Sequence, residues 1–168
     1  FSNIETIETG NKTIIVTSSQ KESVTFSGTG SVYTKDENGV LHGTSGDDNY
    51  SGDGTGQFNP GAGDDSVSDV STVYIDGNRD EFEVLSETMF TVEHTGGDKS
   101  QGKDTLENVD NIVFSDGATV ALKVQQNNGI WQGTDFDDMY SGSGTEQIKP
   151  GAGDDYIYQV DTVIYDGN

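Results

Sequence analysis

Residues 42–78 and 132–168 are two copies of one sequence, offset by 90 residues along the chain. They align without a gap, and 22 of the 37 aligned positions are identical. The short segments 38–41 and 128–131 also match, as do 1–7 and 106–112. A fixed period of this length is typical of arrays in which each repeat packs on its neighbours. We therefore expect an elongated repeat array with three parts: residues 1–41 as the end of a preceding strand-rich spacer, 42–131 as one full repeat, and 132–168 as the first half of the next.

Each repeat has two textures. Residues 43–68 and 133–158 are rich in Gly and Asp, whereas residues 69–131 read as short strands separated by turn signals such as Asp76-Gly77-Asn78. Several short runs are rich in β-branched and aromatic residues, which is typical of strands. They are Thr13–Thr17, Ser23–Ser27, Thr72–Ile75 and Thr162–Tyr165. No stretch has a convincing helical period. The sequence therefore predicts an all-β fold. Because the chain begins without Met and stops inside the repeated pattern, we expect it to be a segment of a longer protein.

The charge of the chain limits its partners. It carries 30 Asp and Glu against 8 Lys and Arg, a net charge of -22, and only 30% of its residues are hydrophobic. A chain that is this acidic and has so small a hydrophobic core needs an external stabiliser, and a bound cation is the simplest one. Nucleic acid is not an expected partner, because binding phosphates requires a basic surface. Insertion into a membrane is not expected either, since no apolar run approaches the length of a span. Adaptation to high salt also explains acidity, but not the fixed positions of Asp among glycines.

The residues and motifs that several kinds of site require are missing from the sequence. The chain has no Cys, which excludes disulfides, thiolate metal sites and thiol nucleophiles. His42 and His94 lack the spacing of a zinc site. Neither a nucleophile elbow nor a phosphate-binding loop is present. We therefore expect no enzymatic activity. A disulfide-free chain that crosses a membrane unfolded fits a secreted or extracellular protein, with attachment to the cell surface as one form.

Four nine-residue stretches share one pattern: 43–51, 60–68, 133–141 and 150–158. Each has Gly or Pro in the first place, Asp in the sixth and an apolar residue in the eighth. Glycine allows the backbone to turn its carbonyl groups toward one point, and the sixth-place Asp adds a carboxylate. Calcium binds six to eight oxygen ligands of these two kinds. The pattern therefore predicts Ca²⁺ sites, although simple Asp-Gly hairpin turns are an alternative.

This pattern resembles the calcium-binding repeat of the repeats-in-toxin (RTX) family, Gly-Gly-x-Gly-x-Asp-x-apolar-x. The resemblance implies short parallel β-roll turns, in which Asp48 lies over Asp65 and Asp138 over Asp155, each pair sharing one ion. The strand-rich segments resemble the spacer layers between RTX clusters of large secreted bacterial proteins. Between the paired turns, Gly56 and Glu146 occupy the expected Asp place, so we expect a poor or empty site there. Phe136 replaces a fourth-place Gly, which we expect to weaken its turn.

The predicted metal ligands all lie in the four turns: Asp48, Asp65, Asp138, Asp155, Gly43, Ser45, Asp47, Gly61, Gly63, Asp64, Gly133, Asp135, Asp137, Gly151, Gly153 and Asp154. For the fifth-place residues Asp47, Asp64, Asp137 and Asp154, ligation through the backbone carbonyl alone is an equal alternative.

The predicted function is that of a calcium-binding structural module in a large secreted or cell-surface protein, such as an adhesin, a surface-layer component or a toxin. Its partners would be calcium ions and the neighbouring repeats of the chain, and extracellular calcium would fold and stiffen it. One alternative is a calcium-dependent accessory domain of a secreted protease or lipase. Another is a carbohydrate-binding module, in which Trp131 and the tyrosines stack on a glycan, although packing in the core also explains these aromatic residues.

Overall fold

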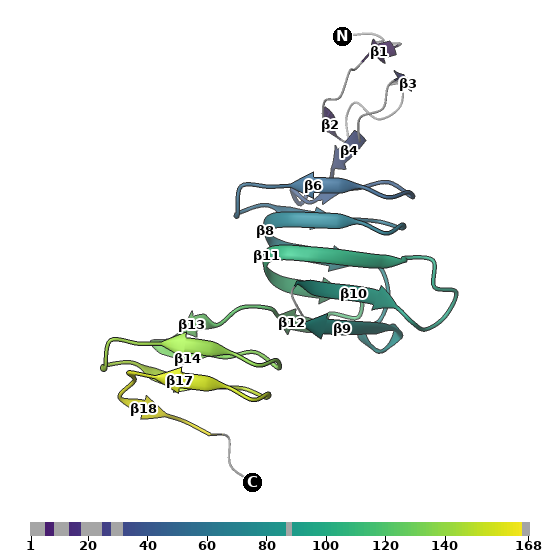
Figure 1. Cartoon of the computed structure of the whole chain (residues 1–168). Coiled ribbons are helices and arrows are strands. Elements are labelled where there is room, and N and C mark those ends of the chain that lie inside the picture. Colours follow the sequence, from purple (N-terminus) through teal and green to yellow (C-terminus); the bar gives the residue numbers. More distant parts are fainter. Residues whose placement is uncertain (1–5, 9–13, 18–24, 28–31, 87–88, 166–168) are drawn as a thin grey trace. The chain divides into compact units, whose positions relative to one another are not determined.

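The computed structural model describes residues 6–8, 14–17, 25–27 and 32–165, apart from 87–88. Within these residues the regular structure is strand, with one turn of 3₁₀ helix, η2 (Arg79–Glu81), and no α-helix (Figure 1). The all-β prediction is confirmed. None of the described residues forms a helix long and apolar enough to cross a membrane. The predicted strand at 23–27 is described only over Thr25–Ser27, and the ends of the matched segments at 1–5 and 166–168 lie outside the described residues.

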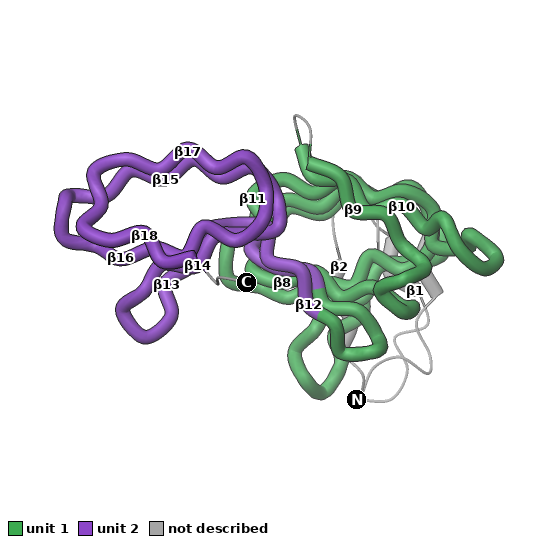
Figure 2. Tube along the Cα trace, turned by 90° about the horizontal axis from the view of Figure 1, so that it is seen from below, with its two compact units in different colours: residues 1–109, 113–118 green, residues 110–112, 119–168 purple. Residues whose placement is uncertain are grey.

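The chain divides into two compact units (Figure 2). The first unit comprises residues 1–109 and 113–118, and the second comprises 110–112 and 119–168. The strands that begin in the first unit are β1 (Thr6–Glu8), β2 (Ile14–Thr17), β3 (Thr25–Ser27), β4 (Val32–Lys35), β5 (Leu41–His42), β6 (Asn49–Ser51), β7 (Gln57–Asn59), β8 (Ser66–Ile75), β9 (Phe82–Ser86), β10 (Phe90–His94) and β11 (Lys103–Phe114). Those of the second unit are β12 (Thr119–Ala121), β13 (Gln125–Asn127), β14 (Ile130–Gln132), β15 (Met139–Ser141), β16 (Gln147–Lys149), β17 (Tyr156–Tyr158) and β18 (Thr162–Val163).

Parallel pairing at a fixed offset organises the first unit. Strand β6 pairs with the start of β8, with Asn49 opposite Ser66, and β5 pairs with β7, with Leu41 opposite Phe58. Both pairs have an offset of 17 residues. Strand β7 then pairs in parallel with the later part of β8. Successive stretches of chain therefore lie beside one another in the same direction, and β8 has partners along both of its halves.

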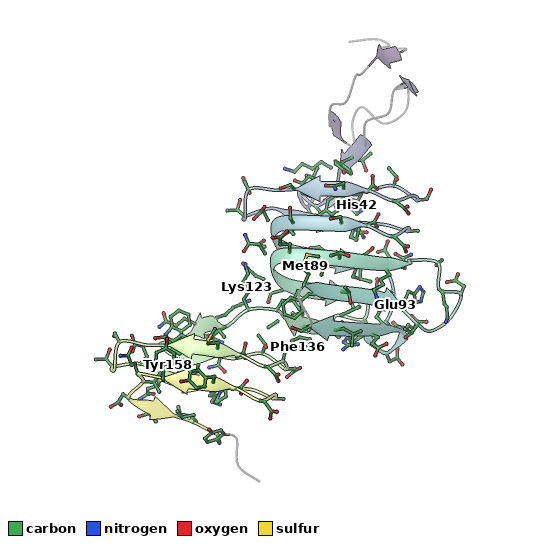
Figure 3. The ribbon with its side chains drawn as sticks, viewed as in Figure 1. His42, Met89, Glu93, Lys123, Phe136 and Tyr158 are labelled. Atoms are coloured by element: carbon green, nitrogen blue, oxygen red, sulfur yellow. The ribbon has the colours of Figure 1, made fainter. Side chains whose placement is uncertain are left out.

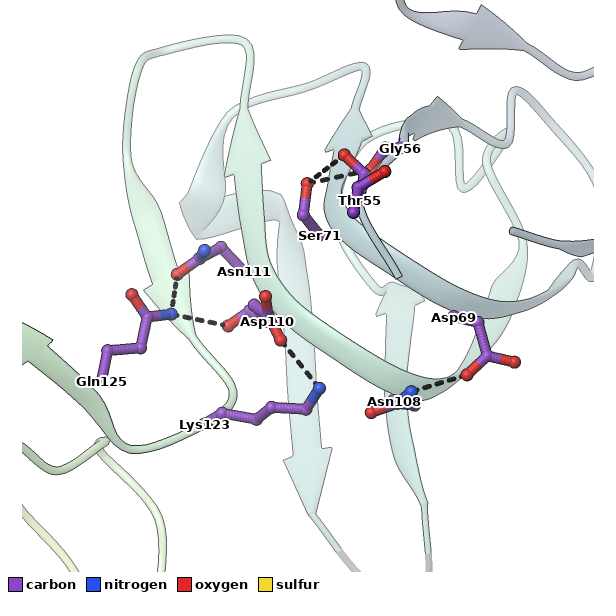
Figure 4. Close-up of polar contacts among 9 residues, drawn as sticks. All are labelled: Thr55, Gly56, Asp69, Ser71, Asn108, Asp110, Asn111, Lys123 and Gln125. Carbon is purple, nitrogen blue, oxygen red and sulfur yellow. Dashed lines mark hydrogen bonds and ion pairs between the residues drawn. The ribbon is translucent and has the colours of Figure 1, made fainter. Parts of the chain in front are cut away.

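The strands after β8 extend this arrangement. Strands β9, β10 and β11 pair antiparallel in sequence order, and β11 returns to lie beside β8. In Figure 1 the strands β6, β8, β11, β10 and β9 lie side by side in this order. Bonds from β11 to β8 and to the residue before it keep an offset near 39 residues: Thr105 N donates to Asp65 O (2.8 Å), and Asn108 Nδ2 donates to Asp69 Oδ1 (2.6 Å; Figure 4).

Both long strands bend at a residue with positive φ. Asp69 has a φ of 54° and Asn108 a φ of 53°, and their side chains are bonded to each other. Asp and Asn tolerate this conformation better than other residues with a side chain. Gln159, in the second copy at the position of Asp69, has a φ of 57°. The bend therefore recurs at one place in the repeat.

The core of the first unit is formed by side chains of β4, β7, β8 and β11. Tyr33, Phe58, Val67, Val73 and Leu106 are buried. The rings of Tyr50 and Phe58 stack at 4.3 Å, and Tyr33 contacts both rings edge-on. The Tyr33 hydroxyl donates to the carbonyl of Asn49 at 2.7 Å, which satisfies the polar end of a buried side chain. The eighth-place residues of the Gly/Asp turns thus supply part of this core.

The second unit repeats the pairing of the first. Strands β14, β16 and β18 are parallel, and so are β15 and β17, with Ile130 opposite Gln147 and Met139 opposite Tyr156. Figure 2 shows a closed outline, with β15 and β17 along one long side and β14, β16 and β18 along the other. Ile148 is fully buried between them. In the same unit, Lys123 Nζ donates to Asp110 Oδ1 at 2.7 Å (Figure 4).

Candidate metal centre

The turns at 43–48 and 60–65 lie directly beside each other. Ala62 N donates to Thr44 O (3.2 Å), and Ser66 N donates to Asp48 O (2.9 Å). The second copy has the equivalent bonds, from Ala152 N to Thr134 O (3.0 Å) and from Tyr156 N to Asp138 O (2.8 Å). The predicted ligands of each copy are therefore gathered at one place in that copy.

The sixth-place carboxylates connect the adjacent turns. Asp48 N donates to Asp65 Oδ1 at 2.8 Å, and Asp138 N donates to Asp155 Oδ1 at 3.0 Å. The earlier carboxylate of each pair also caps its own turn, because Thr44 N donates to Asp48 Oδ2 (2.7 Å) and Thr134 N to Asp138 Oδ2 (2.6 Å). Asp48 is only 6% exposed and Asp65 only 2%. In the first copy these carboxylates thus form a buried column across the turns.

The fifth-place residues form a second column on the exposed side. Asp64 N donates to Asp47 Oδ1 (3.0 Å), and Asp154 N donates to Asp137 Oδ1 (2.8 Å). All four side chains are exposed. The carboxylates of Asp47 and Asp137 therefore have a structural partner in the absence of metal, and the role of all four residues as ligands stays a prediction.

Close approach of the backbones requires glycine at several positions of this stack. A Cβ atom on Gly43 would overlap the carbonyl oxygen of Pro60, and Gly133 meets Pro150 in the same way. Gly63 has a φ of 127°, and its Cβ would lie 2.7 Å from the carbonyl carbon of Gly46. Only glycine fits these approaches. They place carbonyl oxygens against the neighbouring turn, where a cation between turns would need them.

The third-place residues Ser45 and Asp135 are exposed at the turn surface. Asp135 lines a hollow of the second unit together with Gly133, Pro150 and Gly151. The remaining predicted glycines, Gly61, Gly151 and Gly153, all have positive φ, and a Cβ atom on them would overlap the backbone of Thr44, Thr134 and Phe136, respectively.

Phe136 leaves the hydrogen bonds of its turn in place. Phe136 N donates to Thr134 Oγ1 (3.1 Å), as Gly46 N does to Thr44 Oγ1 (3.3 Å). A Cβ atom on Gly46 would meet no atom within 4 Å, and Gly46 does not have positive φ. The fourth place of this turn is therefore open to a side chain, which in the second copy is the Phe136 ring labelled in Figure 3.

The intervening turns hold a carboxylate of their own. Asp53 accepts bonds from Thr55 N (2.9 Å) and Thr55 Oγ1 (2.7 Å), and these bonds lower the pKa of Asp53. In the second copy Glu146 accepts from Ser143 Oγ, Ser143 N and Thr145 N, which lowers the pKa of Glu146 to about 2. Each of these carboxylates therefore accepts hydrogen bonds within its own exposed turn. That these turns bind calcium poorly or not at all stays a prediction.

The structure adds Asp104, which the sequence reasoning missed, to the buried column. Asp65 N donates to Asp104 Oδ1 at 3.1 Å, and Asp104 is only 2% exposed. It lies at the start of β11, in the segment assigned to a spacer. The available signal was the run Gly102-x-Asp104-x-Leu106, which keeps the fourth, sixth and eighth places of the turn pattern without its first-place Gly.

This column lacks a positive partner. Burial raises the pKa of Asp104 to about 8, with the charge of Asp65 as the next cause, and burial raises the pKa of Asp65 to about 6. Burial also raises the pKa of Asp138. Asp65 Oδ2 is buried without a hydrogen-bond partner. The ion pairs of the described residues join Asp36, Glu93 and Asp110 to His42, Lys103 and Lys123, and none includes a carboxylate of the column.

Among the described residues, no group of three or more His, Cys, Asp or Glu side chains is arranged to hold a metal ion. The oxygens that the adjacent turns bring together come from carboxylates and from backbone carbonyl groups. This suits a hard cation such as calcium and does not suit zinc.

No family model matches this chain, and a search of curated proteins found no significant match.

Proposed function

We propose that the chain is a calcium-binding structural module, whose Gly/Asp turns form β-rolls of the RTX kind within a repeat array. The observation that carries this proposal is the pair of carboxylates that adjacent turns share, Asp48 with Asp65 and Asp138 with Asp155, at one spacing in both copies. Asp-Gly hairpin turns would account for neither the parallel pairing at 17 residues nor the burial of Asp48 and Asp65.

The ligands on offer favour calcium over magnesium. The turns supply carboxylate and carbonyl oxygens, and they hold neither thiolate nor imidazole. Calcium accepts six to eight such oxygens in flexible geometry, whereas magnesium demands a near-ideal octahedron and keeps its waters. The closely stacked turns offer many such oxygens, as calcium requires.

Calcium binding would be coupled to folding, because an unfolded chain does not hold the stacked turns together. The net charge of -22 opposes the compact state, and each bound ion removes two units of it. A site occupied at a hundredfold excess of calcium over Kd stabilises the fold by about 2.7 kcal/mol. The chain would then leave the cell unfolded, and fold and stiffen on reaching extracellular calcium. The parent protein would be an adhesin, a surface-layer component or a toxin of the secreted or cell-surface class.

The test is a comparison of the whole chain in EDTA with the chain in millimolar calcium. We expect the calcium form to show more strand in circular dichroism and a melting temperature raised by about 5 °C or more, since 1 kcal/mol corresponds to about 2–8 °C in domains of this size range. Magnesium at the same concentration is the matched control and should have a much smaller effect. Identical spectra and melting temperatures in EDTA and calcium would refute the proposal.

A second candidate, carbohydrate binding, has one observation in its favour. Tyr156 and Tyr158 are 65% and 43% exposed, with their ring centroids 5.5 Å apart on β17, and Tyr158 is labelled in Figure 3. The first copy has Ser66 and Ser68 at these positions, so the repeat itself does not require aromatic rings there. A glycan array probed with and without calcium tests this role, and Tyr156→Ser/Tyr158→Ser is the variant that should lose any binding.

An accessory role in a secreted hydrolase stays an alternative that depends on the rest of the parent protein.

A further inference from the structure

We infer that residues 99–104 form a third turn on the stack, and that Asp104 and Asp65 hold a second divalent cation of the first unit between them. The inference rests on the proposed calcium function and extends it into the segment that reads as a spacer.

Three hydrogen bonds show that Lys103, Asp104 and Thr105 lie beside the second turn as Asp64, Asp65 and Ser66 lie beside the first. Lys103 N donates to Asp64 Oδ1 (2.9 Å), as Asp64 N does to Asp47 Oδ1 (3.0 Å). Asp65 N donates to Asp104 Oδ1 (3.1 Å), as Asp48 N does to Asp65 Oδ1 (2.8 Å). Thr105 N donates to Asp65 O (2.8 Å), as Ser66 N does to Asp48 O (2.9 Å). Over residues 103–105 the third turn therefore relates to the second as the second does to the first.

The close backbone approach recurs as well. Gly102 has a φ of 75°, and a Cβ atom on it would overlap the carbonyl oxygen of Gly63. Gly63 in turn approaches the carbonyl group of Gly46. Two places after Asp104, Leu106 is 1% exposed, as is Val67 in the second turn. The end of β8 together with β9 and β10 thus forms an insertion between two turns that remain stacked, which raises the offset from 17 to 39 residues.

The electrostatics of the third turn point to a cation. Asp65 and Asp104 are both 2% exposed, and Asp65 Oδ2 is buried without a donor. Lys103 Nζ, the nearest basic group in sequence, lies 3.5 Å from Glu93 Oε2 and is half exposed. Two buried carboxylates in contact, without a basic partner among the described residues, require a bound ion or a shared proton. Their oxygens and the Gly63 carbonyl are hard ligands, which match calcium.

The test is isothermal titration of the whole chain with calcium, comparing the wild type with Asp104→Asn. Asparagine still accepts the bond from Asp65 N but lacks the charge. We expect the variant to lose one site, or to weaken one class of sites at least tenfold, while the sites of the second unit are kept. Asp98→Asn is the matched control: it removes one charge just outside the same turn, where the side chain is exposed and bonded only to Ser100 in its own loop. Its titration should stay within twofold of wild type.

Thermal melts give a second readout. In EDTA the Asp104→Asn variant should melt above the wild type, because it relieves repulsion between two buried carboxylates, whereas in calcium it should gain less than the wild type does. If Asp104→Asn does not fold in either condition, Asp104→Ser is measured in its place. A wild type that binds no calcium would overturn the proposed function and this inference together. A wild type that binds calcium, with Asp104→Asn keeping every site at full affinity, would overturn this inference alone.

Discussion

The backbone amide of Asp48 donates a 2.8 Å hydrogen bond to the carboxylate of Asp65, 17 residues later in the chain. The same bond joins Asp138 to Asp155 at the same offset. In each case one carboxylate of a later turn fixes the position of an earlier turn. A ligand that occupies such a pair would therefore act on both turns at once.

The first prediction concerns this pair. Asp48→Ala and Asp65→Ala should each weaken the same calcium site, and the double variant should lie within about 0.5 kcal/mol of the worse single variant, because partners on one ion are not independent. Calcium titration of the three variants measures this. Asp53→Ala is the control, since its carboxylate serves an exposed local turn, and it should leave the site unchanged. Additive losses from Asp48 and Asp65, or an equal loss from Asp53, would contradict a shared site.

The second prediction concerns pH in the absence of calcium. The pKa values of Asp65 and Asp104 are about 6 and about 8 in the folded chain, against 3.8 as the ordinary value. The folded state therefore binds more protons than the unfolded state between about pH 4 and pH 8, and the free energy of unfolding falls as pH rises through this window. The charges that face the pair are Asp47, Asp48 and Asp64, which act in the same direction.

Urea unfolding in EDTA at pH 5 and pH 8 measures this slope. We expect the chain to be more stable at pH 5, and Asp104→Asn to reduce the difference. With calcium present the order should reverse, because the ion binds the deprotonated carboxylates. Greater stability in EDTA at pH 8 than at pH 5 would show that these two acids do not determine the slope.

The sequence predicts much of this arrangement, but only where the period is regular. The offset of 17 residues between Asp48 and Asp65 is readable from the matched turn patterns, and their hydrogen bond has this offset. The sequence did not predict the role of Asp104, because its partner Asp65 is 39 residues away and its turn lacks the first-place Gly. The continuous run of β8 across residues 66–75 was also missed: the texture changes at 68–69, but the chain only bends there, at the positive φ of Asp69. Composition marks the turns, whereas only the backbone shows which turns stack.

The last prediction separates the two kinds of glycine in these turns. Gly43→Ala should destabilise the chain by about 1–3 kcal/mol, because its Cβ atom would overlap the Pro60 carbonyl oxygen and force the two turns apart. Gly46→Ala is the matched control in the same turn. Its Cβ atom would meet no atom within 4 Å, so its effect should stay within about 0.5 kcal/mol. Urea unfolding in calcium measures both. Calcium affinity should fall for Gly43→Ala and not for Gly46→Ala, because only the former moves the carbonyl oxygens between the turns. Equal losses of affinity in the two variants would mean that the separation of the turns does not control binding, and the ion would then lie elsewhere than between them.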